Sequence, residues 1–126
     1  MVISLRDHSD AFYQTARAFD IAERYQIPVL ILADQYLCDG SATVEPFDTD
    51  KVKVAAPSGE AQGEYRRYSI TDSGISPRLI PGLSEHLVEI DSDEHDEKGR
   101  ITESALVRTQ MVDKRARKLE KLKEEL

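Results

Sequence analysis

Residues 28–34 read Pro-Val-Leu-Ile-Leu-Ala-Asp, and they give the clearest sign of secondary structure in the sequence. Five apolar residues, Val29 to Ala33, stand in a row between a proline and an aspartate. A short continuous apolar run with such boundaries is typical of a strand that is buried on both faces of a parallel sheet. We therefore expect a buried strand at residues 29–33.

A helix should precede this strand. Ser9 or Asp10 can cap its first turn, and it should end near Tyr25, because Pro28 disfavours helical geometry at the residue before it. Apolar side chains recur at helical spacing and predict the face that is buried against the strand. They are Phe12, Ala16, Phe19 and Ala22.

Val2 to Leu5 is expected to form a short strand before the helix. Strand, helix and strand together make one βαβ unit, which places the chain in the α/β class. Two parallel strands do not form a stable sheet alone, so further structure must cover them. The unit should span residues 1–38, with Cys38 half-buried in the loop after the second strand.

The sequence changes in character after this unit. Residues 39–66 contain many turn formers, and we expect an extended linker in which Val52 and Val54 allow one short exposed strand. Residues 67–101 should form short strands and loops. The strand candidates are Tyr65 to Thr71 and Leu87 to Ile90, with a shaped loop between them.

Residues 102–126 are expected to form a long C-terminal helix, with Thr102 as its cap and Glu103 in a first turn that the helix dipole favours. A narrow apolar stripe should dock this helix, although a two-stranded coiled coil stays open as the alternative. The stripe consists of Val112, Ala116, Leu119, Leu122 and Leu126. The basic stretch Lys114 to Lys123 should be a solvated face of the same helix.

The composition argues against several classes of protein. A formal net charge of −7 disfavours a nucleic-acid partner, which would need clustered lysine and arginine. The one cysteine cannot make a disulfide framework or hold an iron–sulfur cluster. No apolar run approaches the length of a membrane span, and charged residues follow Met1 too soon for a signal peptide. We expect a cytoplasmic protein with no membrane partner.

The acidic run from Asp91 to Glu97 suggests a calcium loop, but the pattern does not fit one. An EF-hand loop that begins at Asp91 would need glycine at its sixth position and glutamate at its twelfth, where this chain has Asp96 and Thr102. Glu94-His95-Asp96 could be an acid/base group or half of a metal site, or a hydrogen-bonded structural feature. No second histidine stands at helical spacing to complete a zinc pair.

Other common catalytic patterns are absent from the sequence. It contains no glycine-rich phosphate loop, no Walker-type lysine and no nucleophile elbow around a serine. From the residues alone, the chain is an α/β piece with no catalytic, cofactor-binding or metal site of its own.

Several segments, taken in order, resemble one family. They are residues 11–19, 22–29, 32–37, 44–47, 74–82 and 91–99, with 111–115 and 117–119. The order is similar to the alpha subunit of 2-oxoacid:ferredoxin oxidoreductases, particularly the 2-oxoglutarate type, and it covers nearly the whole chain. The most specific matches are Gly-Ile-Ser-Pro-Arg at 74–78 and Asp-Glu-His-Asp-Glu at 93–97.

The resemblance implies a fold, a reaction and partners. The βαβ unit would be the end of a thiamine diphosphate pyrimidine-binding domain. The family oxidatively decarboxylates a 2-oxoacid with coenzyme A, which gives an acyl-CoA and reduced ferredoxin. Thiamine diphosphate, magnesium and iron–sulfur clusters would belong to the whole complex, whose beta and other subunits would be the partners of this chain.

The resemblance also implies what this chain lacks. The family's Tyr-Pro-Ile-Thr-Pro-like motif and its cofactor glutamate lie upstream of the matching segments, so no catalytic or cofactor-binding residue carries over. We expect the isolated chain to be inactive and to self-associate. It would be either part of the oxidoreductase or a free-standing remnant that serves as an interaction module. The interface or substrate-side candidates are Asp34, Tyr36, Ser76, Arg78, Glu94, His95 and Asp96.

Overall fold

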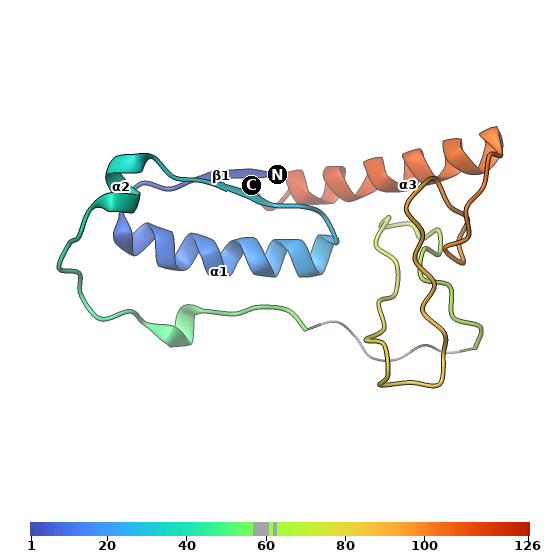
Figure 1. The fold of residues 1–126 in the computed structure, drawn as a ribbon, viewed down its shortest axis with the longest axis horizontal. Coiled ribbons are helices and arrows are strands. Elements are labelled where there is room, and N and C mark those ends of the chain that lie inside the picture. The colour runs from blue at the N-terminus through green and yellow to red at the C-terminus, as the bar shows by residue number, and fades with distance from the viewer. Residues whose placement is uncertain (57–60, 62) are drawn as a thin grey trace. The chain divides into compact units, whose positions relative to one another are not determined.

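The computed structural model describes residues 1–56, 61 and 63–126. The chain divides into two compact units, Met1–Ala56 and Pro57–Leu126 (Figure 1). No helix in the described part of the chain is both long and apolar enough to cross a membrane.

The first unit contains the expected βαβ arrangement. Strand β1 (Val2–Ser4) is followed by helix α1 (His8–Tyr25) and strand β2 (Leu30–Leu32). The two strands are parallel, with Ile3 opposite Ile31. The predicted α/β class is therefore confirmed, and so is the strand at the apolar run.

Helix α1 ends where the sequence predicts but begins earlier. Its cap is Asp7, whose carboxylate accepts a hydrogen bond of 2.8 Å from the backbone N–H of Asp10. The prediction of Ser9 or Asp10 as the cap is therefore wrong, because Asp7 already supplies the acceptor that the first turn needs. The helix ends at Tyr25, and Gln26 takes the left-handed conformation that often follows a helix.

The buried face of α1 differs from the predicted one. Ala18, Ile21 and Tyr25 are buried, whereas Phe19 is 62% exposed. The prediction that Phe19 lies in the core is wrong, because the buried face of α1 is the one that carries Ala18, Ile21 and Tyr25. Phe12 is only half-buried, and its ring stacks on Phe47 with a centroid distance of 4.1 Å.

Strand β2 was predicted to be buried on both faces, and it is not. Leu30, Ile31 and Leu32 are all exposed. The sheet has two strands in the described residues, and α1 is the helix that packs on β2. The burial prediction fails because the sequence indicates a strand suited to a larger sheet than this chain contains.

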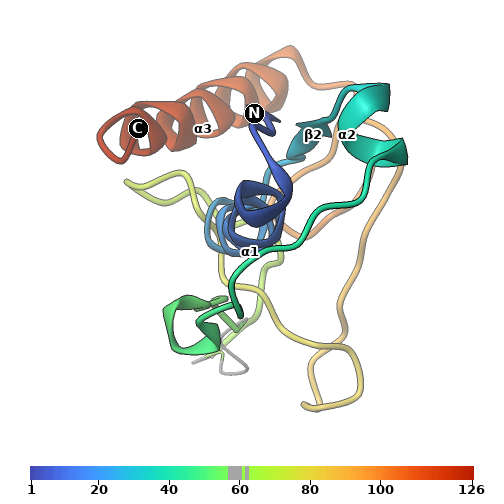
Figure 2. The same ribbon diagram turned by 90° about the vertical axis from the view of Figure 1, so that its left-hand side faces the viewer.

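A short helix, α2 (Gln35–Asp39), follows β2 directly and was not predicted. It places Cys38 at an exposed position on a helix, so the expectation of a half-buried loop cysteine is wrong. The chain then runs back beside α1, as Figures 1 and 2 show. Two hydrogen bonds hold it there, from Asp48 N–H to the Tyr13 hydroxyl at 2.9 Å and from Ala55 N–H to Asp20 at 3.0 Å.

This connection has little regular structure. It contains one 3-10 turn, η1 (Thr49–Lys51), and no strand forms at Val52 or Val54. Residues 40–56 are thus an irregular segment within the first unit, and the part of the expected linker around Pro57-Ser58-Gly59 lies outside the described residues.

The second unit is built around helix α3 (Ala105–Lys123). Its cap is Ser104, whose hydroxyl accepts from the Val107 N–H, so the prediction of Thr102 was two residues early. The strands expected at Tyr65 to Thr71 and Leu87 to Ile90 are not present. Turns occupy much of the region, and its described residues contain one isolated antiparallel bridge, between His95 and Ile101.

Helix α3 packs by a different face from the predicted apolar stripe. Met111, Lys114 and Leu122 are buried, whereas Val112 and Leu119 are about half exposed. The prediction that this stripe docks the helix is therefore wrong except at Leu122. The interpretation of Lys114 as a solvated residue is also wrong, because it shares the helix face of Met111 and Leu122.

Candidate functional site

Asp34 and Tyr36 lie just beyond the carboxyl end of β2. Asp34 caps α2 by accepting a hydrogen bond of 2.8 Å from the Leu37 N–H, and Tyr36 is 92% exposed. In open α/β sheets, ligands bind beyond the carboxyl ends of the strands. A shallow open hollow lies here, lined by Gln35, Tyr36, Asp39, Gly40 and Ser41. The position suits a binding surface, and its lining comes from α2 and the two residues that follow it.

The acidic run in the second unit forms a tight turn. The Asp96 N–H donates to the Arg100 carbonyl at 2.9 Å, and the Gly99 N–H donates to the Asp96 carbonyl at 3.1 Å. The Asp96 carboxylate accepts from the N–H groups of Lys98 at 2.8 Å and Arg100 at 3.0 Å. Burial alone would raise the pKa of Asp96, but these backbone donors outweigh it and the pKa is lowered. Asp96 is thus occupied in shaping the turn.

Glu94 attaches this turn to α3. Its carboxylate forms a two-fold ion pair with Arg115, at 3.0 Å and 2.7 Å. The hydrogen bond from Arg115 is the main reason why the pKa of Glu94 lies below its ordinary value. The carboxylate is therefore held as an anion that docks the turn on the helix.

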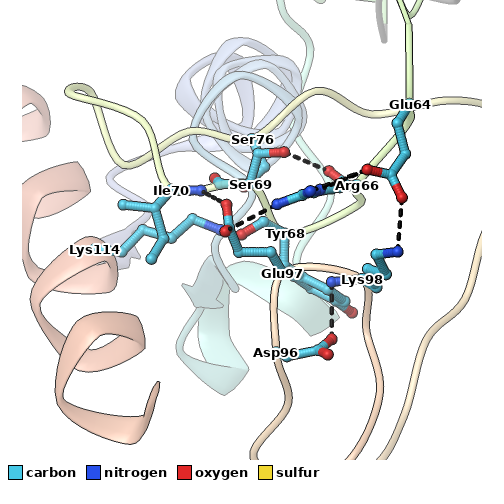
Figure 3. Close-up of polar contacts among 10 residues, drawn as sticks. All are labelled: Glu64, Arg66, Tyr68, Ser69, Ile70, Ser76, Asp96, Glu97, Lys98 and Lys114. Atoms are coloured by element: carbon cyan, nitrogen blue, oxygen red, sulfur yellow. Dashed lines mark hydrogen bonds and ion pairs between the residues drawn. The ribbon is translucent and has the colours of Figure 1, made fainter. Parts of the chain in front are cut away.

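Glu97 attaches the turn to the segment around Tyr68, as Figure 3 shows. One carboxylate oxygen accepts from the Ile70 N–H at 2.8 Å, and the Glu97 carbonyl accepts from the Tyr68 N–H at 2.9 Å. The other carboxylate oxygen lies 3.4 Å from Arg66. These bonds join residues that lie 27 to 31 positions apart in sequence.

A second carboxylate, Glu64, pairs with two cations of the same network (Figure 3). It lies 2.9 Å from Arg66 and 2.6 Å from Lys98. Hydrogen bonds from Lys98 and then Arg66 lower the pKa of Glu64 to about 2. The acidic turn is thus part of a connected set of ion pairs at the protein surface.

His95 lies inside this structure without a metal-binding arrangement. Its ring stacks on Tyr68 with a centroid distance of 3.7 Å, and Nδ1 lies 3.0 Å from the Asp96 carbonyl oxygen. No group of three potential metal ligands occurs among the described residues. Of the two hypotheses for Glu94-His95-Asp96, the contacts favour the hydrogen-bonded structural feature.

Ser76 and Arg78 belong to the same unit. The Ser76 hydroxyl is buried and donates to the Ser69 carbonyl at 2.9 Å. Arg78 is half-buried beside the buried Leu79, whose N–H donates to the Tyr65 hydroxyl at 3.2 Å. Ser76 and His95 are thus both connected to the 65–70 segment, through Ser69 and Tyr68.

The seven candidate residues divide into two groups, with Asp34 and Tyr36 in the first unit and the other five in the second.

The burial of Lys114, the most unusual residue of this network, was not predicted from the sequence. Its side chain is buried, and Nζ donates to the Tyr68 carbonyl at 2.7 Å (Figure 3). Burial, together with the nearby cations Lys118 and Arg67, lowers the pKa of Lys114 to about 8. A signal existed, because Met111 and Leu122 are eleven positions, or three helical turns, apart and Lys114 lies between them on the same face.

The described residues do not form a complete site for the cofactors that the resemblance implies. Asp34, the carboxylate nearest the end of β2, already caps α2, and the neighbouring hollow is open. The described part of the chain offers no metal-ligand cluster, and the one cysteine is exposed. No chemical step can be assigned to a cofactor held by these residues alone.

Comparison with known proteins gives the relationships of the chain. A family profile described as pyruvate flavodoxin/ferredoxin oxidoreductase, thiamine diphosphate-binding, matches residues 1–114. The alpha subunit of 2-oxoacid:ferredoxin oxidoreductase 2 from Aeropyrum pernix is 36% identical over 130 residues, which cover 100% of this chain and 20% of the relative. The alpha subunit of 2-oxoacid:ferredoxin oxidoreductase 1 from Sulfurisphaera tokodaii is also 36% identical, over 95% of this chain and 20% of the relative.

A solved structure agrees with these relatives. The 2-oxoglutarate:ferredoxin oxidoreductase from Magnetococcus marinus, with 2-oxoglutarate, coenzyme A and succinyl-CoA bound, is similar with a TM-score of 0.85 and 29% identity. The similarity covers 98% of this chain and 22% of that one. The chain thus spans about a fifth of the length of the relatives that it matches. It belongs to the pyruvate flavodoxin/ferredoxin oxidoreductase family, whose thiamine diphosphate-binding domain it matches over residues 1–114.

Proposed function

We propose that this chain is part of the alpha subunit of a 2-oxoacid:ferredoxin oxidoreductase and acts only in an assembled complex. The observation that carries this proposal is the family match over residues 1–114, with 36% identity over the whole chain to the alpha subunit from Aeropyrum pernix. The reaction would be the oxidative decarboxylation of a 2-oxoacid to an acyl-CoA. The bound 2-oxoglutarate and succinyl-CoA in the similar structure support 2-oxoglutarate as the substrate.

Within this proposal the chain is a structural part of the catalytic subunit. Thiamine diphosphate, magnesium and iron–sulfur clusters would be held by the whole complex, and the chain would meet the beta and other subunits, ferredoxin and coenzyme A there. The exposed end of β2 with Asp34 and Tyr36, and the half-buried Arg78, are the proposed interface or substrate-side positions. The Glu94–Arg115 ion pair, the stacking of His95 on Tyr68 and the turn that Asp96 shapes would fix the second unit for that assembly.

A chimeric enzyme tests the proposal. The matching segment of the Magnetococcus marinus enzyme is replaced by this chain, and ferredoxin reduction is measured with 2-oxoglutarate and coenzyme A, and separately with pyruvate. We expect activity that depends on coenzyme A and is higher with 2-oxoglutarate. A chimera carrying Ile21→Asp, which places a charge in the core of the first unit, is the matched negative control.

The alternative function is a free-standing interaction module without catalysis. The observation that favours it is the apolar surface that the first unit leaves exposed, at Val2, Phe19, Leu30 and Leu32. A chimera that assembles and remains inactive, together with a stable homo-oligomer of the isolated chain, would support this alternative over the catalytic one.

A further inference from the structure

Four basic residues lie where α3 packs against the 67–74 loop, and we call them the α3 basic cluster: Arg67, Lys114, Arg117 and Lys118. Lys114 is three and four positions before the other two helical members, so all three share one face of α3. The loop is bonded to two of them. Lys114 donates to the Tyr68 carbonyl at 2.7 Å, and Arg117 donates to the Thr71 carbonyl at 3.2 Å.

Two of these cations have donors left over. An ammonium group carries three N–H donors, and the Tyr68 carbonyl is the acceptor that Lys114 Nζ meets. Among the residues described, no carboxylate lies within ion-pairing distance of this buried side chain. Arg117 Nε is also buried and meets no acceptor in the described part of the chain. Buried charges and donors of this kind are costly unless something pairs with them.

The local charge is strongly positive. Burial is the main cause of the lowered pKa of Lys114, and the like charges of Lys118, Arg67 and Arg115 add to it, while the Glu97 carboxylate acts against them. Arg67 and Lys114 also approach the same ring, with the Arg67 guanidinium carbon 4.9 Å and Lys114 Nζ 5.6 Å from the centre of Tyr68. The pKa of Lys118 is lowered by burial and by the positive charges of Arg67 and Arg115. The cations of the cluster thus lie so close together that their mutual repulsion is unfavourable.

We propose that the α3 basic cluster binds a phosphate-type oxyanion, which supplies the acceptors that Lys114 and Arg117 do not find within the described residues. A phosphate group offers three or more oxygens and up to two negative charges, and it can accept from an ammonium and a planar guanidinium together. A single carboxylate offers two oxygens and one charge. Arg117 and Lys118 are half-buried, so part of each side chain remains open to solvent, from which an anion can enter.

This inference does not rest on the proposed function, because it uses the contacts of the second unit alone.

Inorganic pyrophosphate and inorganic phosphate are titrated into the full chain at physiological salt, with calorimetry for affinity and side-chain NMR for the Lys114 ammonium. The test variant is Arg117→Gln with Lys118→Gln. The control is Arg108→Gln with Lys121→Gln, which removes the same two kinds of charge from exposed positions on the same helix.

We expect saturable binding of pyrophosphate that is at least about tenfold weaker in the test variant and within about twofold of wild type in the control. The Lys114 side-chain signal should move with the titration, and circular dichroism should show that both variants keep the α3 helix. No saturable binding, or an equal loss in test and control variants, would overturn the proposal. Tighter binding of the dicarboxylate succinate than of pyrophosphate would overturn the phosphate class.

Discussion

Gly74 lies directly against the backbone of Lys114, so closely that a Cβ atom at position 74 would collide with the Lys114 carbonyl oxygen. The same Cβ would stand 3.1 Å from the backbone nitrogen of Lys118. Gly74 also has a φ of +75°, a backbone angle that residues other than glycine rarely adopt. The Gly-Ile-Ser-Pro-Arg segment therefore approaches α3 by its backbone, and this approach requires glycine.

Gly74→Ala should destabilise the second unit by about 3 kcal/mol or more, because it adds a collision to the backbone strain. Gly82→Ala is the matched control. Gly82 has a similar φ of +86°, but nothing lies within 4 Å of the added Cβ, so strain alone should cost about 1 kcal/mol. Urea unfolding followed by circular dichroism measures both. Equal losses in the two variants would show that the helix does not touch Gly74.

The order of elements in the first unit could be predicted because its signals are local. Pro28 limits the preceding helix, and the apolar run after it suits a strand. The orientation of α1 could not be predicted in the same way. Apolar residues occupy two faces of this helix, one with Phe19 and one with Ile21, and the choice between them depends on where the sheet lies.

The candidate site shows the same division between local and distant information. Its unusual residue types made the acidic run stand out in the sequence, but the partners of its carboxylates are far away. Glu94 meets Arg115 across 21 residues, and Glu97 meets Ile70 across 27. Such pairings depend on tertiary packing, so periodicity and motif spacing cannot identify them. The burial of Lys114 was unexpected for the same reason.

Ile21→Ala should cost about 2–4 kcal/mol of stability in the first unit, because Ile21 is 2% exposed and its truncation leaves a cavity. Phe19→Ala removes a larger side chain from the same helix, yet it should cost less than about 1 kcal/mol because Phe19 is mostly exposed. Thermal unfolding monitored by circular dichroism compares the two. A larger loss of stability for Phe19→Ala would show that the helix face predicted from the sequence is the buried one.

The stability of the second unit should rise between pH 8 and pH 10. The pKa of Lys114 is about 8 in the folded chain and 10.5 as its ordinary value, so the unfolded state binds more protons across this window. The unfavourable contribution of the buried ammonium is fully present below pH 8 and fades as the pH rises towards 10.5. One such group gives a slope of up to about 1.4 kcal/mol per pH unit.

Lys114→Met isolates this effect from other groups that titrate in the same range. The variant should lose most of the rise, whereas Lys121→Met, which changes an exposed lysine of the same helix, should keep it. Urea unfolding at four or five pH values between 7.5 and 10.5 supplies the comparison. Identical slopes for wild type and Lys114→Met would mean that Lys114 titrates normally and is not buried.

We also predict that the isolated chain self-associates through the uncovered side of its small sheet. Val2 lies opposite Leu30 in the parallel pairing, and both are more than half exposed, as is Leu32. Exposed apolar residues gathered on a sheet favour association, since burying them removes apolar area from water. Leu30→Lys combined with Leu32→Lys should therefore lower the apparent mass towards that of a monomer, while costing little folding stability because both side chains are already exposed. Light scattering across a dilution series measures this, with Val112→Lys and Leu119→Lys on α3 as a matched double substitution at a second exposed apolar site. A wild-type chain that stays monomeric at the highest concentration would refute the prediction, and a loss of association in the α3 variant alone would move the contact from the sheet to the helix.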